Sequence, residues 1–157
     1  MQAEIELQVD VSAPVSTTWS WVSQWDRQQE WIPFTRVRHV DGPVLAIGTR
    51  VVARTAVGPI GFDDPMTVTA VAASPDGGRA YEMVHTGRLV QGVGAITVHP
   101  LDSGARSRVV WWERVEVPGG PVAPLLWRIG GPVTRLTFGW ALRRLARRAE
   151  ADPSVPG

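Results

Sequence analysis

The stretch EIELQVDVSAPVSTTWSWV, residues 4–22, carries the pattern on which the fold prediction depends. Apolar and polar residues alternate strictly over Glu4–Val11, which is typical of a β-strand with one buried face. A Ser-Ala-Pro segment (12–14) ends the alternation, and proline suits the first turn of a helix because its missing N–H is not needed there. The next apolar residues recur at helical spacing, as Val15, Trp19 and Val22. The chain therefore begins with a strand that leads directly into a helix.

The rest of the chain predicts six strands and one long helix. A short helical turn over Arg27–Trp31 comes first and ends before Pro33. Beyond it, β-branched runs separated by Gly, Pro and Asp predict strands at Phe34–Asp41, Thr49–Ala56, Phe62–Ala73, Arg79–Thr86, Val90–His99 and Ser107–Val117. The short links between them favour an antiparallel meander.

The last helix, expected to begin after Gly131 or slightly before it, has two apolar stripes. One stripe is suited to pack on the sheet and consists of Thr134, Phe138, Ala141, Leu142, Leu145 and Ala149. The second lies nearly opposite and consists of Ile129, Val133, Leu136 and Trp140. We expect the second stripe to be covered by the Gly120–Arg128 loop, a membrane or another chain, because large exposed apolar patches are rare.

Composition indicates one globular domain. The chain has 157 residues, 44% of them hydrophobic and 20% charged, which is ordinary for a single core. We expect one domain over residues 1–150 and a tail over 151–157, where no packing pattern remains. The longest apolar segment, near Leu125, is interrupted by Arg128 and Pro132, so we predict no stable membrane insertion.

Cysteine and charge content exclude several functional classes. The chain has no Cys, which excludes a disulfide scaffold, a thiolate zinc site and a Cys nucleophile. The start of the sequence lacks the pattern of a signal peptide, and we predict a cytoplasmic location. The formal net charge is only +1, and the arginines of the last helix (143, 144, 147 and 148) are interpreted as a solvated face. We therefore predict no nucleic-acid partner.

Strand alternation assigns the inward-facing residues of two strands, if neither strand contains a bulge. In the last strand, Arg108, Arg114 and Glu116 share a face with Trp112, so that face is expected to be solvated. The inner face then carries Val109, Trp111, Glu113, Val115 and Val117. In Arg79–Thr86, Glu82 faces outward, and the inner face carries Tyr81, Met83 and His85. An ionisable Glu113 on an apolar inner face must be solvated, paired or protonated.

The order of elements, together with the residues at their joints, resembles the START-like (SRPBCC) superfamily of polyketide cyclases, lipid-transfer proteins and relatives of the major birch-pollen allergen. The resemblance covers about Glu4–Glu150. It rests on Val11-Ser12-Ala13-Pro14 before Val15 and Trp19, Trp31 before the second strand, Gly48-Thr49-Arg50 at the third, and Arg108–Trp111 before Pro118-Gly119-Gly120.

This resemblance implies an α+β helix-grip fold: a curved seven-stranded antiparallel sheet around a long C-terminal helix, with two short helices after the first strand. It also implies a cavity between sheet and helix that holds a small hydrophobic ligand. The iron-dependent branch of the superfamily needs two His and a carboxylate as ligands, and His39, His85 and His99 lack that spacing. We expect no cofactor.

Combining alternation, helical spacing and the resemblance, we predict a set of ligand-lining residues. The set consists of Trp31, Phe34, Met66, Tyr81, Met83, His85, Trp111, Glu113 and Phe138. Two other motifs are interpreted structurally: Asp63-Asp64 before Pro65 as a strand-entry turn rather than a metal site, and Gly92-Val93-Gly94 as room for a bulky ligand or a sharp bend.

Three functional hypotheses stay open at this stage. The first is binding of a small hydrophobic or aromatic metabolite, lipid or polyketide-like, in the cavity. The alternative is a polyketide cyclase or dehydratase, for which Glu113 and His85 are the candidate acid and base. The third, a protein-binding regulator or homodimer, depends on the second apolar stripe alone. Glu113 has a purely structural explanation too, as the partner of an arginine such as Arg54 or Arg88, or as a residue at the wet rim of the cavity.

Overall fold

One curved antiparallel sheet and one long helix make up most of the molecule. The computed structural model describes residues 1–154. Its strands are β1 (Gln2–Val11), β2 (Thr35–Asp41), β3 (Arg50–Val57), β4 (Ile60–Ala73), β5 (Arg79–Thr86), β6 (Gln91–Leu101) and β7 (Arg106–Glu116). Its helices are α1 (Val15–Ser23), α2 (Trp25–Gln28) and α3 (Ala123–Glu150), with 3-10 turns at Asp102–Gly104 and Gly120–Val122.

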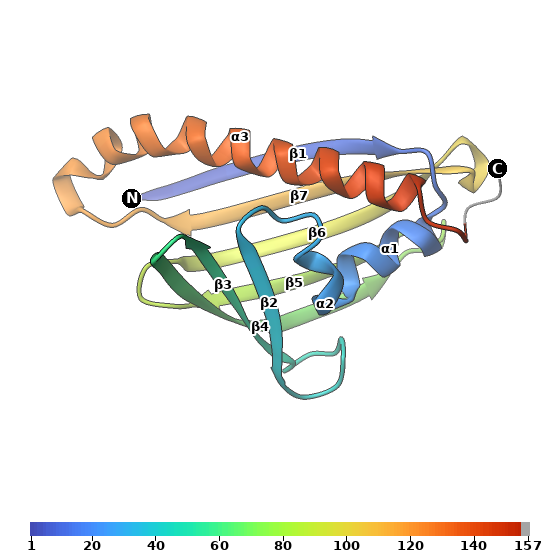
Figure 1. The fold of residues 1–157 in the computed structure, drawn as a ribbon, viewed down its shortest axis with the longest axis horizontal. Coiled ribbons are helices and arrows are strands. Elements are labelled where there is room, and N and C mark those ends of the chain that lie inside the picture. The colour runs from blue at the N-terminus through green and yellow to red at the C-terminus, as the bar shows by residue number, and fades with distance from the viewer. Residues whose placement is uncertain (155–157) are drawn as a thin grey trace.

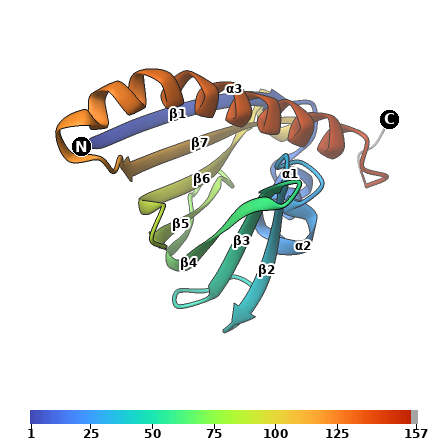
Figure 2. The same cartoon turned by 60° about the vertical axis from the view of Figure 1, so that its left-hand side comes forward.

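The strands follow the order β1-β7-β6-β5-β4-β3-β2, so a meander from β2 to β7 is completed by β1 at the far edge. The sheet curves, and α3 runs along β1 on the concave side of the sheet. Helices α1 and α2 close one end of the space that the curved sheet encloses (Figure 1, Figure 2). This arrangement confirms the helix-grip fold expected from the sequence, with the short helices directly after β1.

The burial of residues in β5 and β7 confirms the predicted inner faces. Alternation predicts these faces correctly because the register between β5, β6 and β7 is unbroken. Trp111 and Glu113 of β7 are buried, whereas Arg114 is exposed. Tyr81, Met83 and His85 of β5 are buried on the same side of the sheet. The register shifts of the sheet occur in β2 and β4, where no inward assignment had been made.

The start of α3 differs from the prediction, because the helix begins at Ala123 and continues through Gly131 and Pro132. A proline inside a helix removes one backbone hydrogen bond and usually forces a break. Here the preceding residue is glycine, which lacks the Cβ that would clash with the proline ring. A Cβ at Gly131 would also lie 3.0 Å from Cε2 of Trp127, so glycine leaves room for that indole ring.

The second apolar stripe of α3 is not covered by residues 120–128, and that part of the prediction is wrong. Those residues belong largely to the helix itself, and Leu125 extends the stripe instead of shielding it. Ile129, Val133 and Leu136 are exposed, as is most of the apolar surface along this side of α3.

Aromatic side chains fill the closed end of the sheet. Tyr81 lies between Trp19 and Trp25, with ring centroids 5.9 and 5.7 Å away in edge-on geometry. Its hydroxyl donates to the carbonyl of Val22 and accepts from Gln28. These contacts attach α1 and α2 to β5 and satisfy the buried hydroxyl of Tyr81, while the indole N–H of Trp25 donates to the carbonyl of Val44.

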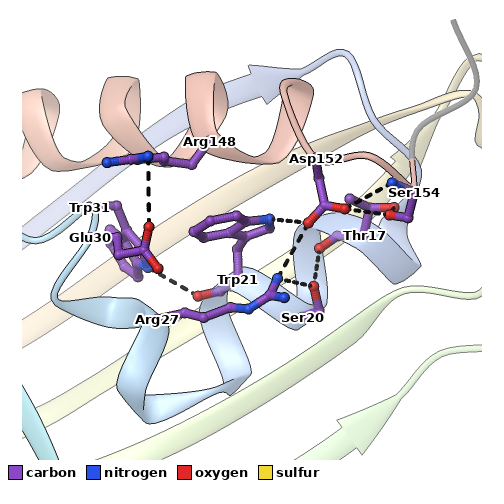
Figure 3. A network of polar contacts seen from close by, with 9 residues as sticks. All are labelled: Thr17, Ser20, Trp21, Arg27, Glu30, Trp31, Arg148, Asp152 and Ser154. Atoms are coloured by element: carbon purple, nitrogen blue, oxygen red, sulfur yellow. Dashed lines mark hydrogen bonds and ion pairs between the residues drawn. The ribbon is translucent and has the colours of Figure 1, made fainter.

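The segment after α3, expected as a tail, is held against α1 by a polar network (Figure 3). Asp152 accepts a hydrogen bond from Nε1 of Trp21 at 2.9 Å and lies 3.4 Å from the guanidinium of Arg27. Its other oxygen accepts from the backbone amide and the hydroxyl of Ser154. The expected tail residues 155–157 lie outside the described residues.

We expect Asp152→Ala to lower the melting temperature at pH 7 by about 2–4 °C, the shift that loss of a modest interaction causes in a domain of this size. The amide and hydroxyl of Ser154, with Trp21 and Arg27, lower the pKa of Asp152 from 3.8 to about 2. A lowered pKa stabilises the folded state above pH 3.8, and that stabilisation is lost as the pH falls through 2.

Urea denaturation of wild type and variant across this range measures the effect. The difference between the two proteins should shrink below pH 3.8. The control variant is Asp26→Ala, which removes an exposed carboxylate of α2. A stability difference that stays constant down to pH 2, or an equal loss of stability in Asp26→Ala, would contradict the assigned role of Asp152.

Candidate functional site

A cavity of about 500 Å³ lies between the concave face of the sheet and the inner face of α3. Side chains from β2 through β7 line it on one side, and Leu126, Trp127, Gly130, Thr134 and Phe138 of α3 line it on the other. Most of these side chains are apolar. The cavity reaches the surface, because its lining includes exposed residues such as Leu89 and Leu126.

Most of the predicted ligand-lining residues come together in this cavity. They are Met66, Tyr81, Met83, His85, Trp111, Glu113 and Phe138. Their positions follow from strand alternation in β4, β5 and β7 and from helical spacing in α3. That a ligand contacts them stays a prediction.

Trp31 and Phe34 do not line the cavity. Trp31 is fully buried, donates its indole N–H to the carbonyl of Trp21, and packs edge-on against Trp111 at 5.7 Å. Phe34 has a positive φ of 59°, and its exposed ring lies 5.9 Å from that of Trp140 on the outer side of the molecule. Trp31 therefore supports the cavity wall from behind, and Phe34 extends the outer apolar surface.

Trp111 forms a flat, firmly held part of the wall. Its ring stacks on Phe138 with centroids 4.1 Å apart and planes 13° apart, so β7 and α3 meet here. Its indole N–H donates to Oε1 of Glu113 at 2.8 Å. Contacts on one ring face, one edge and the N–H leave this side chain little rotational freedom.

Three ionisable side chains form a buried cluster in the same wall. Nδ1 of His85 lies 2.8 Å from Oδ2 of Asp64, and Nε2 lies 3.2 Å from Oε2 of Glu113. Each of the three residues is only 8% exposed. Glu113 thus pairs with His85 and Trp111, and the proposed arginine partners are elsewhere: Arg54 pairs with Asp63 on the exposed side of the sheet.

Asp64 was missed by the sequence interpretation, which treated it as part of a turn. It lies inside β4, two residues before Met66, and therefore shares the inner face with that predicted cavity residue. Alternation along 60–68 was the signal that would have found it. Among buried side-chain atoms of residues 1–154, only Oδ1 of Asp64 has no hydrogen-bond partner, which leaves an unused acceptor in the cluster.

Gly94 explains how His85 and Glu113 meet across an intervening strand. In β6, Gly94 is directly opposite Glu113 on one side and Met83 on the other, while His85 lies two residues beyond Met83 and opposite Gly92. A Cβ at Gly94 would lie 2.9 Å from Oε1 of Glu113 and 3.1 Å from Nε2 of His85. The missing side chain thus makes room for the ion pair. Gly94 also lines the cavity, so its expected role as room for a bulky ligand stays a prediction.

The cluster favours a charged imidazole. Burial alone lowers the pKa of His85, but hydrogen bonds to Asp64 and Glu113 and the negative charge of both carboxylates outweigh burial and raise it to about 10. At neutral pH both ring nitrogens of His85 therefore donate. As arranged, the ring offers no nitrogen lone pair to a metal ion, and no other set of three suitable ligands occurs in residues 1–154.

Comparison with known proteins identifies a matching family and several similar folds. A family described as polyketide cyclase / dehydrase and lipid transport matches residues 2–150. No curated protein sequence matches the chain at a significant level.

Three solved structures share the fold at low sequence identity. The aromatase/cyclase ZhuI from Streptomyces sp. R1128 is 16% identical, covers 96% of this chain and 94% of its own, and has a TM-score of 0.71. TTHA0849 from Thermus thermophilus is 12% identical, with coverages of 97% and 100% and a TM-score of 0.75. Norcoclaurine synthase from Thalictrum flavum, in complex with dopamine and hydroxybenzaldehyde, is 14% identical, with coverages of 98% and 90% and a TM-score of 0.65.

We expect Gly94→Ala to lower the pKa of His85 from about 10 toward 6.5, because the added methyl group separates His85 from Glu113. An NMR titration of the imidazole resonances measures it, with exposed His39 and His99 as internal references. Gly139→Ala, in α3 where the nearest contact is an arginine side chain, is the matched control. An unchanged His85 titration in Gly94→Ala would show that the glycine does not determine the pairing.

Proposed function

The chain belongs to the polyketide cyclase / dehydrase and lipid transport family, and we propose that it binds a small aromatic or polyketide-like metabolite in its internal cavity. The observation that carries the proposal is an apolar cavity with one charged cluster in its wall. The apolar surface supplies affinity, and the cluster selects the polar group of the ligand.

The size and lining of the cavity support a small hydrophobic ligand. Its volume of about 500 Å³ falls within the ~300–1,000 Å³ typical of small-molecule sites. Met66, Met83, Ile96 and Phe138 present flexible or flat apolar surface, so the transfer of a hydrophobic molecule from water is favourable.

The Trp111 wall supports a flat ligand. This ring is held by Phe138, Trp31 and Glu113, so a ligand that contacts it loses little free energy in ordering it. Aromatic rings pair favourably in stacked or edge-on geometry. A fused-ring or conjugated skeleton therefore suits this part of the cavity.

The cluster favours a ligand that donates a hydrogen bond. His85 supplies two N–H groups and Trp111 supplies one, against two carboxylates that can each accept several. Acceptors are in excess, and Oδ1 of Asp64 has no donor at all. A phenol or enol hydroxyl that enters the cavity would supply a further donor to these carboxylates, whose residues both line it.

A second candidate function, acid–base catalysis on a poly-β-ketone, is favoured by the position of His85 between two carboxylates. A carboxylate of the cluster would take a proton from the carbon between two ketones, and this carbon would then attack the carbonyl carbon of another ketone. As the C=O π bond breaks, the imidazolium would protonate the ketone oxygen, giving a ring alcohol. The names of two similar structures, an aromatase/cyclase and norcoclaurine synthase, support this candidate.

We expect 2-naphthol to bind at least about tenfold more tightly than 2-methylnaphthalene, because a hydrogen bond to a charged group contributes about 1.5–3 kcal/mol. The two probes share shape and differ in the hydroxyl. Titration calorimetry with wild type, Glu113→Gln and the outer-face control Glu82→Gln measures the ratio, which should fall only in Glu113→Gln. Equal affinity for both probes in the wild type would refute the polar part of the proposal, and no binding of either would refute the hydrophobic part.

Turnover separates the two candidates. Under the binding proposal, we expect a short poly-β-ketone thioester to cyclise no faster with the wild-type protein than in buffer. Cyclisation that is catalysed by the wild type and falls about 10²–10⁴-fold in His85→Gln, with probe affinity retained, would establish the enzyme instead.

A further inference from the structure

No other helix or strand lies over the outer side of α3 (Figure 1, Figure 2). This side carries a long row of exposed apolar side chains. We call the outer strip the side chains of Leu125, Ile129, Val133, Leu136 and Trp140. At 100° per residue these positions fall on one side of the helix. Ile129 and Leu136 are 68% and 71% exposed, so the strip faces solvent directly. Phe34 packs on Trp140 and widens it.

Positive charge surrounds the outer strip. Arg128 and Arg135 lie beside it along α3, and Arg143 and Arg147 continue the same side toward the C-terminal end. All four are exposed, and no carboxylate within residues 1–154 forms an ion pair with them. The helix contains no acidic residue before Glu150. Along α3 itself the strip therefore has a positive border, and beyond the helix Glu30 pairs with Arg148.

This charge pattern disfavours a second copy of the chain as the partner. A two-fold contact would place the strip of one α3 on the strip of another, in a parallel or antiparallel arrangement. In both arrangements the flanking arginines of one helix approach those of the other with no acidic residue of α3 to compensate. Like charges brought together across an interface are unfavourable.

We propose that the outer strip docks on the surface of an anionic lipid bilayer. Helices that lie in a membrane interface combine an apolar side with a basic border, as this one does. Arginines near the surface are attracted to anionic headgroups, and Trp140 suits the boundary between headgroup and acyl chain. The helix would lie on the bilayer, since no helix in residues 1–154 is long and apolar enough to cross one.

The same helix would then bring the cavity to the membrane. Leu126, beside the outer strip, is both exposed and part of the cavity lining, as is Leu89 of the β5–β6 loop. A hydrophobic ligand could pass between bilayer and cavity without crossing open water. This consequence rests on the proposed function, whereas the docking itself does not.

Flotation with lipid vesicles tests the proposal. We expect the protein to float with vesicles of phosphatidylcholine and phosphatidylglycerol, and at least about tenfold less with phosphatidylcholine alone, because each arginine adds attraction to an anionic surface. High salt should release it, since screening shortens the reach of charge. Failure to float with the anionic vesicles would overturn the proposal, whatever the outcome of the naphthol titrations.

Variants distinguish binding through the outer strip from non-specific adsorption to vesicles. Ile129→Glu with Leu136→Glu should abolish flotation, and Arg135→Glu with Arg143→Glu should weaken it, while circular dichroism melts stay near wild type. Ile47→Glu, an equally exposed residue of the β2–β3 loop, is the matched control and should float as wild type. If the variant with Ile129→Glu and Leu136→Glu still floated, the outer strip would not be the membrane-binding surface. A dimer in sedimentation that this variant dissociates would also refute the proposal, because the occupant would then be a second copy.

Discussion

The structure depends on a mismatch of width between one helix and a seven-stranded sheet. Seven strands about 4.8 Å apart span roughly 30 Å, whereas a helix with its side chains is about 10–12 Å across. Because α3 runs along β1 at one side, it cannot fill the concave face. The aromatic cluster of α1, α2 and β5 fills one end, and the remaining space is the cavity.

The charged residues in the wall of this cavity are buried away from water. Their burial is unfavourable unless they interact with one another. An isolated buried charge is unstable, and here the imidazole of His85 contacts the carboxylates of both Asp64 and Glu113, so each buried charge faces an opposite one. Glu113 also fixes Trp111, which in turn stacks on Phe138 of α3. The polar cluster and the aromatic wall are therefore directly coupled, so we expect a substitution in one to alter the packing of the other.

The long helix has two different sides. Its inner side closes the cavity through residues such as Phe138, and its C-terminal half fills the core with Leu142 and Leu145. Its outer side leaves an apolar strip in solvent, which stability alone does not explain because burial of apolar surface is what stabilises a fold. Selection for an interaction with another surface is a physical reason to keep such residues exposed.

The sequence by itself determined the order of elements, the inward faces of β5 and β7, and the apolar content of the cavity, because alternation and helical spacing are local patterns. It did not reveal that α3 begins at Ala123, since Pro132 is a local stop signal, and the helix continues through it with glycine at position 131. Nor did it bring Asp64 to His85, or show that Trp31 lies behind the wall instead of in it. Those facts depend on which residues face each other across paired strands, and the meeting of His85 with Glu113 required Gly94 between them. Register joins residues far apart in the chain, so only the tertiary structure decided it.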